Sequence, residues 1–223
     1  MDIVYQIMMG VSLAACAGFR AWLPLLITGI MARTGHITLN ESMQFLARNE
    51  MLIIFGIASV LEFCGDKFIV IDHFLDAVGT VARPIAGTLL LSSMLTKMDL
   101  STTLVLGLIG GGGTSLILHA GKAVARAKAT LLSPFHGGLA NAALSIGEDF
   151  LSGLGSLMVF IWPALAFAFA MALLITAVLL IVVGYKAGRK LYSALSEEPV
   201  QIEPALQMPI GTSLPGTITV EPQ

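Results

Sequence analysis

The chain has 223 residues, of which 56% are hydrophobic and only 12% are charged, and its formal net charge at pH 7 is −2. Soluble domains typically carry about 25% charged residues. A chain of this length also keeps a large surface that must contact water when it folds in solution. The composition therefore excludes an ordinary soluble domain and predicts a polytopic membrane protein. The weak net charge and the lack of a basic tract give no reason to expect nucleic-acid binding.

Long uncharged runs predict about six membrane segments, because a helix needs roughly 20 apolar residues to cross a bilayer. The expected segments cover residues 7–31, 50–66, 84–96, 101–120, 137–155 and 158–185. The uncharged run from Phe150 to Tyr185 is too long for one helix, so we expect a break at Trp162-Pro163, where proline removes a backbone donor. Between the first two segments, TLNE at 38–41 resembles a capping box and predicts a short amphipathic interfacial helix.

These segments predict an all-α transmembrane helix bundle over residues 1–192, with broken or re-entrant helices. Residues 193–223 are expected to be a disordered cytoplasmic tail, since the chain from Ser196 on holds five of the nine prolines and no basic residue. Counting Lys and Arg on each side favours a cytoplasmic location for both termini. The inner side then holds eight basic residues: Lys67, Arg83, Lys122, Arg126, Lys128, Lys186, Arg189 and Lys190. The outer side holds Arg33, Arg48 and Lys97.

The middle of the chain suggests an internal repeat. VARPIAGTLL at 81–90 and LLSPFHGGLA at 131–140 share a proline followed by a glycine three residues later. The pattern predicts two helix-connector-helix units of the same orientation, 50–97 and 101–155, although chance similarity of short motifs remains an alternative. Pro84 and Pro134 are each expected in the first turn of a helix. The glycine-rich run at 107–115 lacks the residues of a phosphate loop and is expected to allow close helix contact.

Two groups of charged residues occupy neighbouring segments. The acidic group consists of Glu62, Asp66, Asp72 and Asp76. The basic group consists of His119, Lys122 and Arg126, which share a helix face at positions i, i+3 and i+7. Because isolated charges are costly in a low-dielectric region, we expect the two groups to face each other in a sheltered polar centre. The alternative is that both groups lie in cytoplasmic loops and are solvated.

Arg20 lies near the middle of the first expected segment, where a cation is costly unless it is paired. Its expected partner is Glu148 or Asp149 in the fifth segment. Such a pair would either fix the packing of two helices or provide a charge in a solute pathway.

Two predicted helix starts are candidate anion sites, because the N–H groups of a first helical turn attract anions. Arg83 adjoins the start at Pro84, and Lys122, Arg126, His136 and Asn141 are expected around the start at Pro134. Lys67, which follows Asp66, is a further candidate pathway residue.

Five motifs resemble an uncharacterised bacterial integral-membrane family known as a domain of unknown function. They are GFRAWLPLL, LEFCGDKFIVIDHFLD, ARPIAGTLL, HAGKAVARAKATLLSPFHGGLAN and SIGEDF, in this order between about residues 10 and 180. The resemblance implies a multi-pass protein of the bacterial inner membrane and carries over no catalytic residue.

The pattern favours a transporter or channel for a small, anionic solute, with proton coupling as an option. The alternatives are a protein that binds or flips lipid phosphates and a non-catalytic membrane scaffold. No catalytic, metal-binding or cofactor-binding motif is evident, so we expect neither enzyme activity nor a cofactor. The expected partners are membrane lipids, an unknown small solute and a second copy of the chain in a homo-oligomer.

Overall fold

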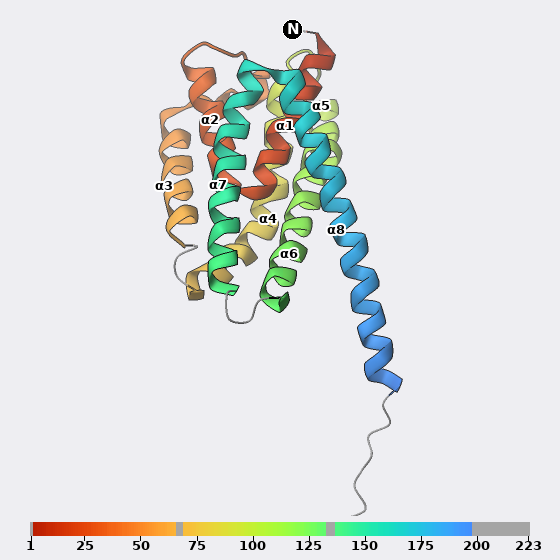
Figure 1. Ribbon diagram of the computed structural model, residues 1–223. Coiled ribbons are helices and arrows are strands. Elements are labelled where there is room, and N and C mark those ends of the chain that lie inside the picture. The colour runs from red at the N-terminus through yellow and green to blue at the C-terminus, as the bar shows by residue number, and fades with distance from the viewer. Residues whose placement is uncertain (1, 66–68, 133–136, 198–223) are drawn as a thin grey trace, which may run out of the picture. The chain divides into compact units, whose positions relative to one another are not determined.

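The computed structural model describes residues 2–65, 69–132 and 137–197, and the regular structure in these ranges is entirely helical (Figure 1). The elements are α1 (Ile3–Phe19), α2 (Trp22–Arg33), the 3-10 helix η1 (Glu41–Ala47), α3 (Asn49–Gly65), α4 (Ile69–Met94), α5 (Leu100–Leu106), the π-helix η2 (Gly107–Gly112), α6 (Gly113–Leu132), α7 (Gly137–Ile161) and α8 (Pro163–Glu197). The all-α prediction is confirmed.

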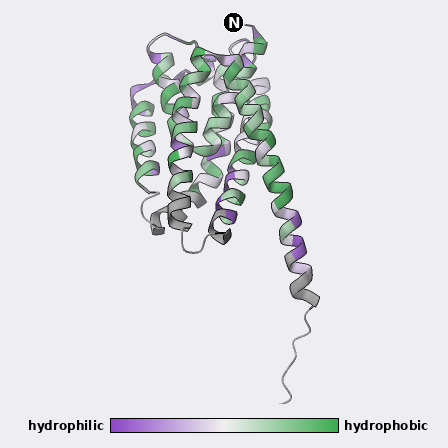
Figure 2. Cartoon of the chain, viewed as in Figure 1, coloured by the Kyte–Doolittle hydropathy of each residue, from purple (hydrophilic) through white to green (hydrophobic). Residues whose placement is uncertain are grey.

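The chain divides into two compact units, Met1–Tyr185 and Lys186–Gln223, and the arrangement below is that of the first unit. Figure 2 shows the helices of this unit mostly in the colours of apolar residues, with short hydrophilic interruptions. Of the tail expected at 193–223, residues 198–223 lie outside the described part of the chain.

The first two helices form a hairpin that enters and leaves the bundle at the same end. Gln6 in α1 donates from Nε2 to Thr96 Oγ1 (2.9 Å), and its Oε1 accepts from the Thr96 N–H (3.2 Å). Asn40, which follows α2, donates from Nδ2 to the Leu95 carbonyl (2.6 Å). Both ends of the hairpin therefore lie beside the α4–α5 turn, and Figure 1 shows α1 and α2 running in opposite directions. The prediction that residues 7–31 form one crossing is wrong.

Helix length explains the hairpin. α1 has 17 residues and α2 has 12, which at about 1.5 Å per residue gives roughly 25 and 18 Å. Neither helix reaches across a hydrocarbon core of about 30 Å. Four longer helices are apolar enough to cross a membrane, and a fifth candidate arises if η1 and α3, bent by 60°, count as one span. The described ranges thus contain fewer candidate spans than the six expected.

The break between the last two helices is confirmed, because α7 ends at Ile161 and α8 begins at Pro163. The short helix after TLNE is also present as η1. Its cap is Asn40, whose Oδ1 accepts from the Ser42 N–H (3.0 Å), rather than Thr38. The interfacial position of η1 stays a prediction.

Pro84 lies inside α4, which begins at Ile69, so the prediction that a helix starts at Pro84 is wrong. The apolar stretch before it, which was expected to be a connector, continues the helix instead. The proline costs one backbone hydrogen bond, and the Pro84 carbonyl accepts from Thr88 Oγ1 (2.8 Å). Pro134 lies outside the described residues, and the internal repeat stays a prediction.

Glycines bring α4 and the η2–α6 helix into close contact. A Cβ atom on Gly87 would lie 2.5 Å from the Gly111 carbonyl oxygen and 2.7 Å from Ser115 Cβ. A Cβ atom on Gly111 would lie 2.9 Å from Leu91 Cβ. The expected role of the glycine-rich run in close helix contact is therefore confirmed, and this contact holds Arg83 on α4 opposite His119 on α6.

We expect Gly87→Ala to destabilise the fold, because the added methyl group overpacks the contact with α6 by about 1–3 kcal/mol. Gly113→Ala is the matched control, since a Cβ atom there meets nothing within 4 Å. Thermal unfolding in detergent, followed by circular dichroism, should show a lower midpoint for Gly87→Ala and an unchanged or higher one for Gly113→Ala. Equal midpoints would contradict the close contact.

The hairpin also changes the expected topology. With the Lys128 end of the bundle in the cytoplasm, residue 2 is expected on the same, outer side as Lys97. In a Cys16→Ala, Cys64→Ala background, a membrane-impermeant thiol reagent should label Asp2→Cys and Lys97→Cys from outside but not Lys128→Cys. Labelling of residues 2 and 128 from one common side would restore the single crossing at 7–31.

Candidate functional site

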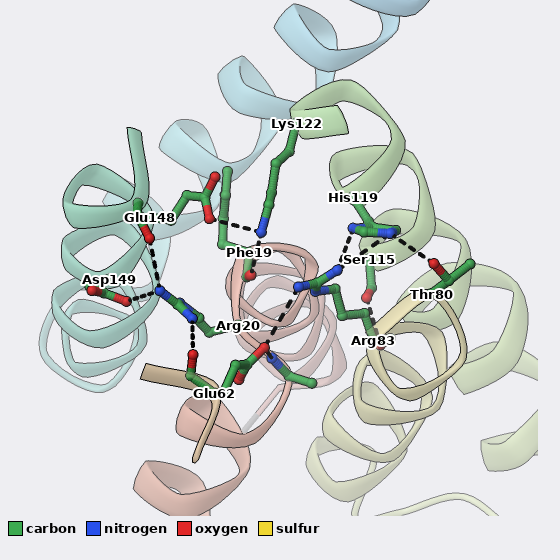
Figure 3. A network of polar contacts seen from close by, with 12 residues as sticks. Phe19, Arg20, Glu62, Thr80, Arg83, Ser115, His119, Lys122, Glu148 and Asp149 are labelled. Atoms are coloured by element: carbon green, nitrogen blue, oxygen red, sulfur yellow. Dashed lines mark hydrogen bonds and ion pairs between the residues drawn. The ribbon is translucent and has the colours of Figure 1, made fainter. Parts of the chain in front are cut away.

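Eight side chains with charged or imidazole groups meet in the interior of the bundle, and we call them the polar centre (Figure 3). They are Arg20, Glu62, Arg83, His119, Lys122, Arg126, Glu148 and Asp149. All except Arg126 and Asp149 are buried residues. The alternative of solvated loop charges is therefore wrong for the buried members.

Arg20 lies where the hairpin turns, with extended backbone (φ −133°, ψ 120°) between α1 and α2. Its Nη2 forms an ion pair with Asp149 Oδ1 (2.7 Å) and donates to Ser145 Oγ (3.3 Å), both on α7. Its Nη1 donates to the Glu62 carbonyl near the C-terminus of α3 (2.8 Å). The expected partnership with Asp149 is confirmed, and Arg20 ties the hairpin to both α3 and α7.

The break in the hairpin leaves helix-end backbone groups inside the bundle, and charged side chains satisfy them. Lys122 Nζ donates to the Phe19 carbonyl at the end of α1 (3.3 Å). The Ala21 N–H, just before α2, donates to Glu62 Oε1 (3.3 Å). A cation thus lies at a helix C-terminus and a carboxylate at a helix N-terminus, which matches the sign of each helix dipole.

Arg83 on α4 contacts both Glu62 on α3 and His119 on α6. Its Nη2 lies 3.7 Å from Glu62 Oε1, and its Nη1 lies 2.6 Å from His119 Nδ1. A guanidinium group can only donate, so Nδ1 accepts, and we assign the proton of a neutral imidazole to Nε2. That assignment lets Nε2 donate to Thr80 Oγ1 at 3.3 Å. Ser115 Oγ donates to the Arg83 carbonyl (2.6 Å), which anchors the backbone of α4 to α6.

Glu148 holds two cations of α6. Arg126 donates from Nε to Oε1 (3.1 Å) and from Nη2 to Oε2 (2.9 Å), which is a two-bond fork. Lys122 Nζ lies 2.8 Å from the same Oε2. These three side chains together carry one excess positive charge.

The described ion pairs differ from the expected pairing of the acidic group with the basic group. Glu62 pairs with Arg83 in its own half of the chain, and Lys122 and Arg126 pair with Glu148 in theirs. The contact between Arg83 and His119 and the bonds of Arg20 connect the halves. Asp66, Lys67 and His136 lie outside the described residues, as do the side chains of Asp72, Asp76 and Asn141.

Two clefts reach the polar centre along different faces of α7. One, of about 570 Å³, lies between α6, α7 and α8 and is lined by Lys122, Arg126 and Glu148. The other, of about 530 Å³, lies between α2, α3 and α7 and is lined by Arg20, Glu62 and Asp149. Glu148 and Asp149 are adjacent on α7, so their side chains point about 100° apart. They therefore line different clefts.

Several participants were missed in the sequence. The Phe19 carbonyl, Thr80, Ser115 and Ser145 complete the hydrogen bonds of the charged groups. The hydroxyl residues could have been suspected because they are polar side chains within apolar segments. A backbone carbonyl belongs to every residue, so the sequence gives no sign of its role. Within the described ranges, no three His, Cys, Asp or Glu side chains gather as metal ligands would.

The family described as Domain of unknown function (DUF4126) matches residues 7–183, and the chain therefore belongs to this family. The resemblance noted from the sequence motifs is thereby confirmed at the level of the family. No curated protein and no solved structure matches the chain.

Arg20→Met is expected to destabilise the fold by about 3–5 kcal/mol, because it removes a buried guanidinium group that pairs with Asp149 and donates to the Glu62 carbonyl. Arg33→Met is the control, since Arg33 is exposed and the described contact of its guanidinium is a hydrogen bond to the Ala47 carbonyl at 3.4 Å. Chemical or thermal unfolding in detergent measures the difference. Similar stabilities of the two variants would contradict a structural role for the Arg20–Asp149 pair.

Proposed function

We propose that this membrane protein is a transporter for a small anionic solute and that Lys122 and Arg126 bind the anion in the cleft between α6, α7 and α8. The observation that carries the proposal is the pair of cations that line a cleft of about 570 Å³ within the apolar bundle. Cations that line a cavity between apolar helices are a usual mark of a solute pathway.

Lys122 also has one N–H donor more than its described acceptors use. Its ammonium group has three N–H donors, and its acceptors are Glu148 Oε2 and the Phe19 carbonyl. Since Lys122 lines the cleft, an anion there can accept this third hydrogen bond.

The broken hairpin supports transport as the use of this site. Many secondary transporters place their substrate at discontinuous helices, whose free backbone groups face the site. Here the break between α1 and α2 lies at the polar centre, and Lys122 contacts both the break and the cleft.

A second candidate is the handling of a lipid phosphate, and the walls of the same cleft favour it. Apart from Lys122, Arg126, Glu148 and Thr176, its lining residues are apolar or glycine. A cleft whose lining combines a few charged groups with many apolar side chains suits an amphiphile whose head group is anionic. Lipid chains would then occupy the space between α7 and α8.

We propose no catalytic role and no cofactor for this protein. The proposed setting is the bacterial inner membrane, with lipids as neighbours and a homo-oligomer as an option for the assembly.

The proposal predicts that Lys122→Met and Arg126→Met each weaken anion binding about tenfold to a hundredfold, as loss of a charged hydrogen bond does. The control is Lys97→Met, which removes an exposed lysine outside the cleft. Titration calorimetry of the purified protein with phosphate, acetate and dodecyl phosphate measures binding, and uptake into vesicles measures flux.

The outcomes separate the two candidates. Binding and flux of phosphate or acetate support the small-solute transporter. Binding of dodecyl phosphate alone, together with phospholipid that co-purifies with the wild type but not with Lys122→Met, supports lipid handling instead. Anion binding that Lys122→Met and Arg126→Met leave unchanged overturns the assigned site.

A further inference from the structure

We propose that Glu148 is a built-in competitor that occupies the anion site, and that a substrate anion binds by displacing its carboxylate from Lys122 and Arg126. The inference rests on the proposed function and adds how the site is held in the absence of substrate. It assigns Glu148 a role that differs from that of its neighbour Asp149.

The geometry of Glu148 is that of a bound anion. Both of its carboxylate oxygens accept from Arg126, at 3.1 and 2.9 Å, and Lys122 adds a contact of 2.8 Å to Oε2. A free carboxylate or phosphate bound by these two cations would use the same fork and the same ammonium group. The site is therefore already occupied by a carboxylate that belongs to the protein.

Among the residues that the structure describes, Glu148 has no charged partner other than Lys122 and Arg126. The described contacts of its carboxylate are those with Lys122 and Arg126 on α6. The residues that α8 contributes to the cleft are Leu173, Thr176, Ala177 and Leu180, none of which is charged. Asp149 differs, because its carboxylate forms an ion pair with Arg20 on the other face of α7.

Occupation of the site by the protein's own Glu148 carboxylate stabilises the protein when no substrate anion is bound. The carboxylate lies between two neighbouring cations of α6 and offsets part of the cost of placing these charges inside the bundle. The contact also lowers the apparent affinity for a free anion, because the anion must compete with Glu148. The affinity falls in proportion to the fraction of the protein in which the Glu148 carboxylate does not occupy the site.

The Glu148→Gln variant separates this role from a packing role by the sign of its effect. If Glu148 competes, the neutral amide frees Lys122 and Arg126, and the affinity for acetate and phosphate rises at least tenfold. If Glu148 only holds the helices in place, the same change loosens the site, and affinity falls or stays the same. Asp149→Asn is the matched control, since it removes the same charge one residue away from an ion pair with Arg20.

Titration calorimetry of the full-length protein in detergent, with acetate and inorganic phosphate as probes, measures these affinities. The expected result is tighter binding in Glu148→Gln, no gain in Asp149→Asn and loss of the gain in the double variant Glu148→Gln, Lys122→Met. A weaker or unchanged affinity in Glu148→Gln overturns the competitor role.

A stability measurement keeps the test decisive if Glu148→Gln folds poorly. Added acetate should raise the unfolding temperature of Glu148→Gln far more than that of the wild type or of Asp149→Asn, because free acetate replaces the missing carboxylate. Equal shifts in all three proteins overturn the competitor role.

The result also distinguishes this inference from the proposed function. If Lys122→Met weakens anion binding but Glu148→Gln does not strengthen it, the proposed anion site is supported and the competitor role of Glu148 is wrong. If neither the wild type nor Glu148→Gln binds any probe, both fall.

Discussion

The structure depends on the need to satisfy a broken helix inside an apolar bundle. Where the hairpin turns at Arg20 and Ala21, helix-end carbonyl and N–H groups lie away from water, and such groups must find partners within the protein. Lys122 supplies a donor to the end of α1, and Glu62 supplies an acceptor at the start of α2. Arg20 adds bonds to α3 and α7. The charges that are costly to bury are thus what makes the break tolerable.

The remaining charges follow from that arrangement. Lys122 and Glu62 lie on different helices, and each shares its charge with further partners, Glu148 and Arg83. Arg83 reaches His119 because glycines allow α4 and α6 to approach closely. Packing and electrostatics are therefore coupled here. The close approach of α4 and the η2–α6 helix at their glycines determines where the buried guanidinium group of Arg83 can lie.

Structural and functional roles need not exclude each other in such a centre. The Arg20–Asp149 pair lies on one face of α7 and holds the hairpin, whereas Glu148 lies on another and faces a cleft. In the competitor role that we propose for Glu148, its carboxylate would stabilise the site in the absence of substrate and would set the affinity that a substrate must exceed. The same contact would then contribute to folding and to anion binding, and the two contributions would differ in how an added anion changes them.

The sequence alone determined the helical class, the break at Pro163 and the need of Arg20 for an acidic partner, because hydropathy, proline and intramembrane charge act locally or through composition. It left open which of two adjacent acids is that partner, since neighbours on a helix point about 100° apart. Tertiary structure decided this choice, the helical continuation through Pro84 and the turning back of the first apolar run at Arg20. Hydropathy measures how apolar a helix is, whereas its path depends on the polar groups that other helices offer to its broken backbone.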